Sequence, residues 1–268
     1  MNTTYDEVMG GSPTPERSSA LLYFIRMEFL KLLRMPTFSI PALLFPVLFF
    51  SMFGLPQVSR SLSGLSGGLY MLVAYGAYTV MSVSMFSFSV AVAVERTLGW
   101  HNLLRASPMK PQLYFLGKSI VTAGFGLLGL AILFAFCYVV GGIRPPVGTL
   151  LAIVGYLGVG LLPFSALGLV LGYSLGPSSV IGVANAIFLS LAFAAGIFLP
   201  YQLLPEIIQK AALVLPSYHL AQLGWNAAAG SGLSTQLEHL AWLLGYTIAF
   251  FLLARTLYQR ASSRSAGQ

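Results

Sequence analysis

The chain has 268 residues, 57% of them hydrophobic and 8% charged, with a formal net charge of +7. Soluble domains carry roughly 25% charged residues, so this composition excludes an ordinary soluble protein. The basic residues stand at the boundaries of long apolar runs instead of forming one patch, which argues against a nucleic-acid partner. The runs also lack the alternation typical of a transmembrane barrel, so we expect an all-α polytopic membrane protein.

Residues 1–19 are polar and contain several Gly, Ser and Pro residues, which predicts a disordered cytoplasmic N-terminus. Residues 20–36 form an amphipathic helix, which we expect to lie in the membrane interface with its basic side toward anionic headgroups. On a helical wheel, the apolar side carries Leu21, Ile25, Phe29, Leu32 and Leu33, and the charged side carries Glu28, Lys31 and Arg34.

Six apolar runs make up a transmembrane domain over residues 37–258, and residues 259–268 form a cytoplasmic tail. In the fourth run, Gly168, Gly172 and Gly176 recur at a spacing that predicts close helix packing, either within one subunit or at a dimer face. The predicted spans cover residues 37–55, 69–94, 113–141, 149–173, 180–199 and 240–258.

The distribution of basic residues predicts the orientation. Eleven of the 14 Lys and Arg residues fall on one side of the membrane if the N-terminus is inside, and only Arg60, Arg144 and Lys210 fall on the other. The positive-inside rule therefore places both termini and the connection after the second span in the cytoplasm. Lys118 and Arg255 lie near the ends of spans, where we expect their side chains to reach water.

The connection over residues 95–111 is too polar for a bilayer and too apolar for a free linker. Residues 97–106 can form a short helix that presents Leu103 and Leu104 on one side, and Pro108 helps to end it. A short helix that is charged at its start and held between two spans is suited to be pushed by a cytoplasmic partner. An ordinary cytoplasmic connector is the alternative interpretation.

Residues 200–230 are too apolar for a loop, but three prolines interrupt them. We expect two short helices that re-enter the outer leaflet and form a structured vestibule, which serves either as a plug or as a gate. The candidate vestibule residues are Glu206, Lys210, Tyr218 and His219.

No catalytic or metal-binding set is predicted. His101, His219 and His239 are assigned to different loops and lack the spacing of a zinc hydrolase, and Cys137 is the single cysteine. The spans also lack a central ionisable residue of the kind that proton-coupled pumps use. The chain therefore lacks its own energy source for transport, and something else must supply it.

A phosphate-binding loop is also excluded. Gly117 and Lys118 resemble the end of such a loop, but position 112 is Gln where the motif needs glycine.

The order of these parts resembles the ABC-2-type permeases of bacterial ABC exporters. The first span and the P-S-Y-H-L-A-Q-L run that begins at Pro216 are similar to the drug-exporter and antibiotic-resistance branch. The E-R-x-x-G…L-L…P…L-G-K signature around the coupling helix of that family is matched by Glu95-Arg96, Gly99, Leu103-Leu104, Pro108 and Leu116-Gly117-Lys118.

The resemblance implies the ABC-2 exporter fold, with an interfacial helix, six spans, a cytoplasmic coupling helix over residues 95–111 and re-entrant outer helices over residues 200–230. It also implies a multi-pass protein of the bacterial cytoplasmic membrane, with membrane lipids and a second permease copy as partners. A separate ATPase subunit would bind ATP and Mg²⁺, so this chain would hold no cofactor and would not be an enzyme. The residues implied to contact that ATPase are Glu95, Arg96, Gly99, Leu103, Leu104, Arg105 and Pro108.

The expected activity is export of a hydrophobic or amphipathic substrate, such as a drug, an antibiotic, a lipid-like molecule or a polysaccharide. Two alternatives from other classes stay open. One is an intramembrane enzyme that uses His219 and Glu206 at the outer face, and the other is a passive channel.

Overall fold

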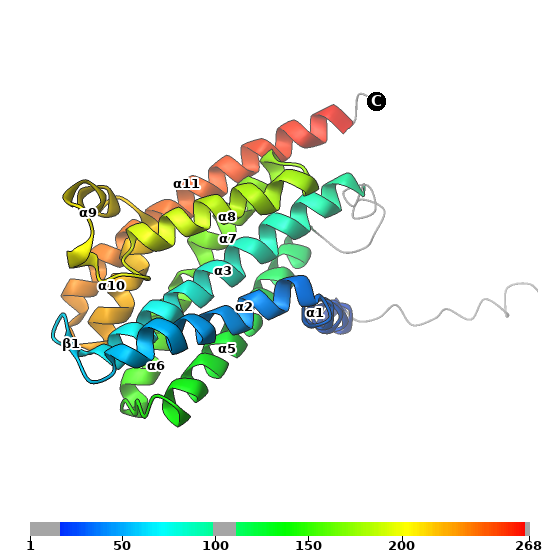
Figure 1. Cartoon of the computed structure of the whole chain (residues 1–268). Helices are drawn as coiled ribbons and strands as arrows, with labels where there is room; N and C mark the ends of the chain where they lie inside the picture. Colours follow the sequence, from blue (N-terminus) through cyan, green and yellow to red (C-terminus); the bar gives the residue numbers. More distant parts are fainter. Residues whose placement is uncertain (1–16, 99–110, 266–268) are drawn as a thin grey trace, which may run out of the picture.

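The computed structural model describes residues 17–98 and 111–265, in which long helices pack side by side with one short hairpin (Figure 1). Within these residues, six helical segments are long and apolar enough to cross a membrane, which confirms the predicted all-α polytopic class. The sixth begins well before residue 240, and the fifth ends before residue 199. The six segments are Phe38–Gln57, Gly67–Thr97, Leu113–Val139, Val147–Ser174, Pro177–Ala194 and Leu233–Arg260.

Helix α3 lies at the centre of the bundle. In its apolar window 78% of the residues are buried, against 11% in α11, and α2, α5, α7, α8 and α10 all pack on α3. The helices are α1 (Arg17–Leu33), α2 (Pro36–Phe49), α3 (Gly67–Thr97), α5 (Pro111–Val139), α6 (Val147–Val159), α7 (Leu161–Ser174), α8 (Pro177–Ala194), α9 (Glu206–Ala212), α10 (Pro216–Ala228) and α11 (Leu233–Ser265).

Several buried hydroxyl groups of α3 are satisfied by the helix itself. Thr79 donates a hydrogen bond to the carbonyl of Tyr75 over 2.8 Å, and Ser84 donates one to the carbonyl of Val80 over 2.6 Å. This back-bonding gives these two hydroxyls a partner within the central helix, whereas the hydroxyls of Tyr75 and Ser89 on the same helix have no hydrogen-bond partner among the described residues. At its start, the side chain of Ser66 caps the helix by accepting from the N–H of Leu69.

Glycines allow α7 to approach α3 closely. A Cβ at Gly168 would lie 2.6 Å from the carbonyl oxygen of Met85, and one at Gly172 would lie 2.8 Å from the Cβ of Val92. Any larger residue would therefore push the two helices apart. These two glycines serve packing within one subunit, whereas a Cβ at Gly176 would meet no atom within 4 Å.

Two of the spans are interrupted, where the sequence predicts continuous helices. The first span continues beyond α2 as a π-helical segment, Phe50–Gly54, and a 3₁₀ turn, Leu55–Gln57. The fourth span divides at Gly160 into α6 and α7. Pro163 accounts for the second break, because it has no N–H to donate to the preceding turn.

The connection between the first two spans contains a hairpin that the sequence did not predict. Strands β1 (Ser61–Leu62) and β2 (Leu65–Ser66) are antiparallel, with Ser61 opposite Ser66. The two turn residues, Ser63 and Gly64, both have positive φ, as a two-residue primed turn requires.

The bundle has two distinct ends (Figure 1). Helix α1, the end of α3, the start of α5 and the end of α11 gather at one end, here called the α1 end. The β-hairpin, α9 and α10 lie at the other, here called the α9 end. In Figure 1, α1 is seen almost along its axis while the bundle helices run across the view, so α1 lies at a steep angle to them.

Candidate functional site

A group of charged side chains joins three helices at the α1 end. We call Glu28 on α1, Glu95 on α3, and Tyr114 and Lys118 on α5 the charge cluster. The ammonium of Lys118 lies 2.7 Å from Glu95 Oε1 and 3.4 Å from Glu28 Oε1. Tyr114 donates its hydroxyl hydrogen to Glu95 and accepts a 3.0 Å hydrogen bond from Lys118.

The charges in this cluster lie away from solvent. The side chain of Lys118 is 3% exposed, and those of Glu28 and Glu95 are 12% and 15% exposed. Lys118 therefore does not reach water, contrary to the prediction, because two carboxylates satisfy its charge within the protein. A buried ammonium needs such partners, since an uncompensated charge in this environment is strongly unfavourable. Lys31, which is more exposed, lies 3.4 Å from Glu28 and offsets the second carboxylate.

Gly117 explains how α1 reaches this cluster. A Cβ at Gly117 would lie 2.7 Å from the ring of Phe24 and 3.3 Å from Leu21 Cδ1. The absence of a side chain therefore lets α1 cross α5 one residue before Lys118, where Glu28 can contact it. The Leu-Gly-Lys run that resembles a phosphate loop is instead a helix-crossing point followed by a buried cation.

Glu28 occupies a different position from the predicted one. The sequence pattern predicts it on the charged side of α1 together with Lys31 and Arg34. At about 100° per residue, however, Glu28 is only about 20° around the helix from Leu21, so it faces the bundle with the apolar residues. In the structure it is correspondingly sheltered and bound to Lys118.

Arg96, the neighbour of Glu95, is directed toward another helix. Its guanidinium donates hydrogen bonds to the carbonyl oxygens of Tyr173 and Leu175, the latter over 2.9 Å. These carbonyls lie at the end of α7, where a cation also interacts favourably with the helix dipole. The end of α3 is thus attached to α5 through Glu95 and to α7 through Arg96.

The remaining residues predicted to contact an ATPase lie outside the described part of the chain. These are Gly99, Leu103, Leu104, Arg105 and Pro108. The structure describes the two flanks of their segment, which are the end of α3 and the start of α5. The charge cluster connects these flanks directly through the contact between Glu95 and Lys118.

The four predicted vestibule residues separate into two pairs. Glu206 and Lys210 lie on α9, form an ion pair over 2.7 Å, and are both largely exposed. Tyr218 and His219 lie on α10, which packs against α3, α6 and α11. Among the described residues no contact joins Glu206 to His219, so the structure does not assemble the outer-face enzyme site considered from the sequence.

His219 and His239 contact each other, which corrects their assignment to separate loops. They lie on α10 and α11, and their Nδ1 atoms are 2.9 Å apart. His219 Nε2 lies 3.0 Å from the carbonyl of Leu213, which can only accept, so Nε2 carries the hydrogen and Nδ1 accepts from His239. Burial first, and then the neighbouring His239, lower the pKa of His219.

This pair could have been found from the sequence. Helices α10 and α11 are joined by a short connection, so they can form a hairpin, and His219 lies nine residues before the end of α10 while His239 lies six residues after the start of α11. Within the described residues, no third His, Cys, Asp or Glu joins them in a group that could hold a metal ion. The pair therefore fixes α10 to α11.

Comparison with known proteins identifies the family. The sequence profile of the family described as "ABC-2 family transporter protein" matches residues 55–255, which is most of the chain. A relative from Bacillus subtilis (strain 168), named "Putative transport permease YvfS", is 24% identical over 234 residues, which cover 87% of this chain and 94% of the relative. Together with the six membrane-spanning segments, these matches mean that the chain belongs to the ABC-2 transporter family and is a multi-pass membrane permease subunit of an ABC transporter.

Proposed function

We propose that this permease subunit exports a hydrophobic or amphipathic substrate, driven by a separate ATPase subunit that contacts the segment between α3 and α5. The single observation that carries the proposal is the charge cluster, because it connects both flanks of that segment to each other and to α1. The family membership supports an ABC ATPase as the partner.

The cluster provides a route from the partner to the bundle. A displacement of the segment between Leu98 and Pro111 acts on Glu95 and Lys118 together, since these two side chains are bound to each other. Helix α3 then carries the displacement into the centre of the protein, because most of the other helices pack on it. Arg96 extends the same attachment to the end of α7. A displacement of the segment can thus pass through the charge cluster to α3 and from α3 to the helices packed on it.

The most exposed spans indicate where further membrane partners can bind. In the apolar windows of α8 and α11, only 22% and 11% of the residues are buried in the single chain. Lipid tails or a second permease copy can cover such apolar surface, and we propose that both do, with a homodimer or a related heterodimer as the assembly.

The proposal predicts ATP-dependent uptake by inverted membrane vesicles. We expect vesicles that contain the chain and its co-purifying ATPase to accumulate a fluorescent amphipathic dye when ATP is added. Vesicles with ADP, and vesicles with an ATPase-inactive partner, serve as controls. Dye accumulation that needs no nucleotide would instead indicate a passive channel, and purification of the active chain without any ATPase would contradict the proposal.

The orientation is tested by single-cysteine labelling. In a Cys137→Ala background, an impermeant thiol reagent should label Glu206→Cys from outside intact cells and should label Arg105→Cys only after the cells are opened. Glu206 is the matched control because it is largely exposed at the α9 end. Labelling of position 105 from outside would contradict the proposed topology, in which both termini are cytoplasmic.

A further inference from the structure

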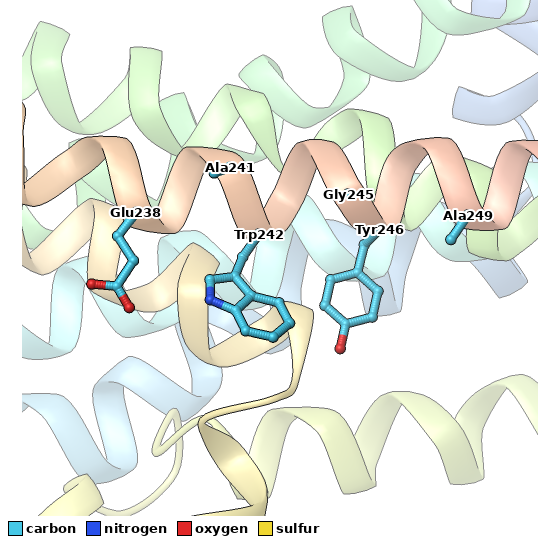
Figure 2. Close-up of a pocket in the computed structure, with 6 residues that line it drawn as sticks. All are labelled: Glu238, Ala241, Trp242, Gly245, Tyr246 and Ala249. Atoms are coloured by element: carbon cyan, nitrogen blue, oxygen red, sulfur yellow. The ribbon is translucent and has the colours of Figure 1, made fainter.

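An open groove of about 510 Å³ runs along one face of α11 at the α9 end (Figure 2). The groove is lined by Glu238, Ala241, Trp242, Gly245, Tyr246 and Ala249.

The lining residues form two parallel rows with helical spacing. Glu238, Trp242 and Tyr246 are four residues apart and point to the same side of α11 (Figure 2). Ala241, Gly245 and Ala249 have the same spacing and form the floor beside them. At 1.5 Å per residue, the groove passes along about 12 Å of helix between Glu238 and Tyr246. Its acidic residue, Glu238, therefore lies at one end, and the aromatic and small apolar residues run side by side from there to Ala249.

The two aromatic side chains of the groove, Trp242 and Tyr246, are held by contacts with α10 and with the segment before it. The indole of Trp242 stacks on the ring of His219, with centroids 5.0 Å apart and planes inclined by 11°. Tyr246 donates its hydroxyl hydrogen to the carbonyl of Val214, in the connection between α9 and α10. His219 is fixed in turn by its hydrogen bonds to His239 and Leu213. Trp242 nevertheless remains 40% exposed, so the rest of its ring is available to a ligand.

The charge at the acidic end favours a cation. Glu238 is exposed, and among the described residues it forms no ion pair with a Lys or Arg side chain. Beside it, the indole of Trp242 offers the aromatic face that binds an ammonium group best. Glu238 is also close to the start of the apolar segment Leu233–Arg260, whereas Gly245 and Ala249 lie deeper along it.

We propose that this groove binds an alkylammonium amphiphile. Its ammonium group lies against Glu238 and Trp242, and its alkyl chain follows the floor past Gly245 and Ala249. The binding site does not depend on the proposed export activity, because a ligand can occupy it whether or not it is transported. A membrane lipid with an ammonium headgroup and a soluble cationic amphiphile share this chemistry.

A second copy of the chain fits the groove less well. An apolar helix packed on the small residues would remove water from Glu238 without supplying a counter-charge, and burial of an unpaired carboxylate is strongly unfavourable. An alkylammonium ligand instead supplies the charge where the carboxylate lies and the apolar chain where the floor lies.

The proposal is tested by quenching of Trp fluorescence with a nitroxide-labelled hexadecyl-dimethylammonium probe. The full chain is placed in phosphatidylglycerol nanodiscs, which contain no ammonium headgroup. In a Trp100→Phe background, we expect saturable quenching that disappears when Trp242→Phe is added, because the remaining Trp225 is buried against Tyr70 away from the groove. We also expect Glu238→Gln to weaken probe binding about tenfold, as loss of a charge contact beside an aromatic ring predicts.

Two controls separate this site from general attraction of the probe to the membrane. Glu206→Gln removes the same charge from exposed α9 and should leave probe binding unchanged. An uncharged nitroxide probe of equal chain length should not distinguish wild type from Glu238→Gln. Equal binding of the cationic probe to wild type and Glu238→Gln would overturn the proposal.

Two further measurements complete the test. Phosphatidylethanolamine added to the nanodiscs should compete with the probe if a lipid is the natural occupant, and should not compete if a soluble amphiphile is. Occupation by a second copy would be revealed by disulfide-linked dimers of Gly245→Cys in a Cys137→Ala background, and that result would also overturn the proposal.

Discussion

Replacing Lys118 with methionine is expected to lower the free energy of unfolding by about 3 to 5 kcal/mol, as removal of one partner from a buried ion pair typically does. Lys118 is almost fully buried, and its ammonium is the shared partner of Glu95 and Glu28. Methionine fills a similar volume but leaves both carboxylates without that cation. Denaturant unfolding of the purified chain in detergent, followed by Trp fluorescence, measures the change.

Two variants make the comparison specific to the cluster. Lys31→Met removes the same charge from a half-exposed side chain and should cost no more than about 1 kcal/mol. Lys118→Met combined with Glu95→Gln should recover part of the lost stability, because one of the two stranded charges is gone. If Lys118→Met is as stable as Lys31→Met, the cluster does not hold the helices together.

The spans could be predicted because a bilayer imposes their length and composition. About 20 apolar residues are needed to cross it, so the six segments are visible as runs in the sequence. Their interruptions were less visible. Gly160 and Pro163 lie within an apolar run, and hydropathy does not distinguish a continuous helix from one that breaks between α6 and α7.

The charge cluster could not be predicted because its members are far apart in the sequence. Glu28, Glu95 and Lys118 each lie near the end of a helix, where a charged side chain ordinarily reaches water. Only the crossing of α1 over Gly117 brings the three together. The signature that carries the family resemblance contains Glu95, Gly117 and Lys118, which are two members of the charge cluster and the glycine at the helix crossing. The signature alone does not indicate that these residues lie close together.

The position of Glu95 affects how coupling can be tested. The family resemblance implies that this residue contacts an ATPase partner. In the structure its carboxylate binds Lys118 and Tyr114 inside the chain. A Glu95 variant therefore changes the packing at the α1 end together with any coupling, and it cannot separate the two effects.

The pair Leu103 and Leu104 offers a cleaner test of coupling. These residues lie between the described flanks and are not members of the charge cluster. We expect Leu103→Ser with Leu104→Ser to reduce ATP-driven transport at least tenfold, because two leucines that fill a groove on the ATPase would together contribute several kcal/mol of burial. Vesicle uptake measures transport, and co-purification measures binding of the ATPase.

The control for this pair carries the same chemical change at the α9 end. Leu203 and Ile207 are highly exposed there, and Leu203→Ser with Ile207→Ser likewise replaces two apolar side chains with serine. We expect this control to insert, to bind the ATPase and to transport at the wild-type rate. The Leu103–Leu104 variant should insert equally well and unfold at the same denaturant concentration as wild type, since the charge cluster is intact. If it also transports at the wild-type rate, the segment between α3 and α5 does not receive the force of the ATPase, and coupling must reach the bundle elsewhere.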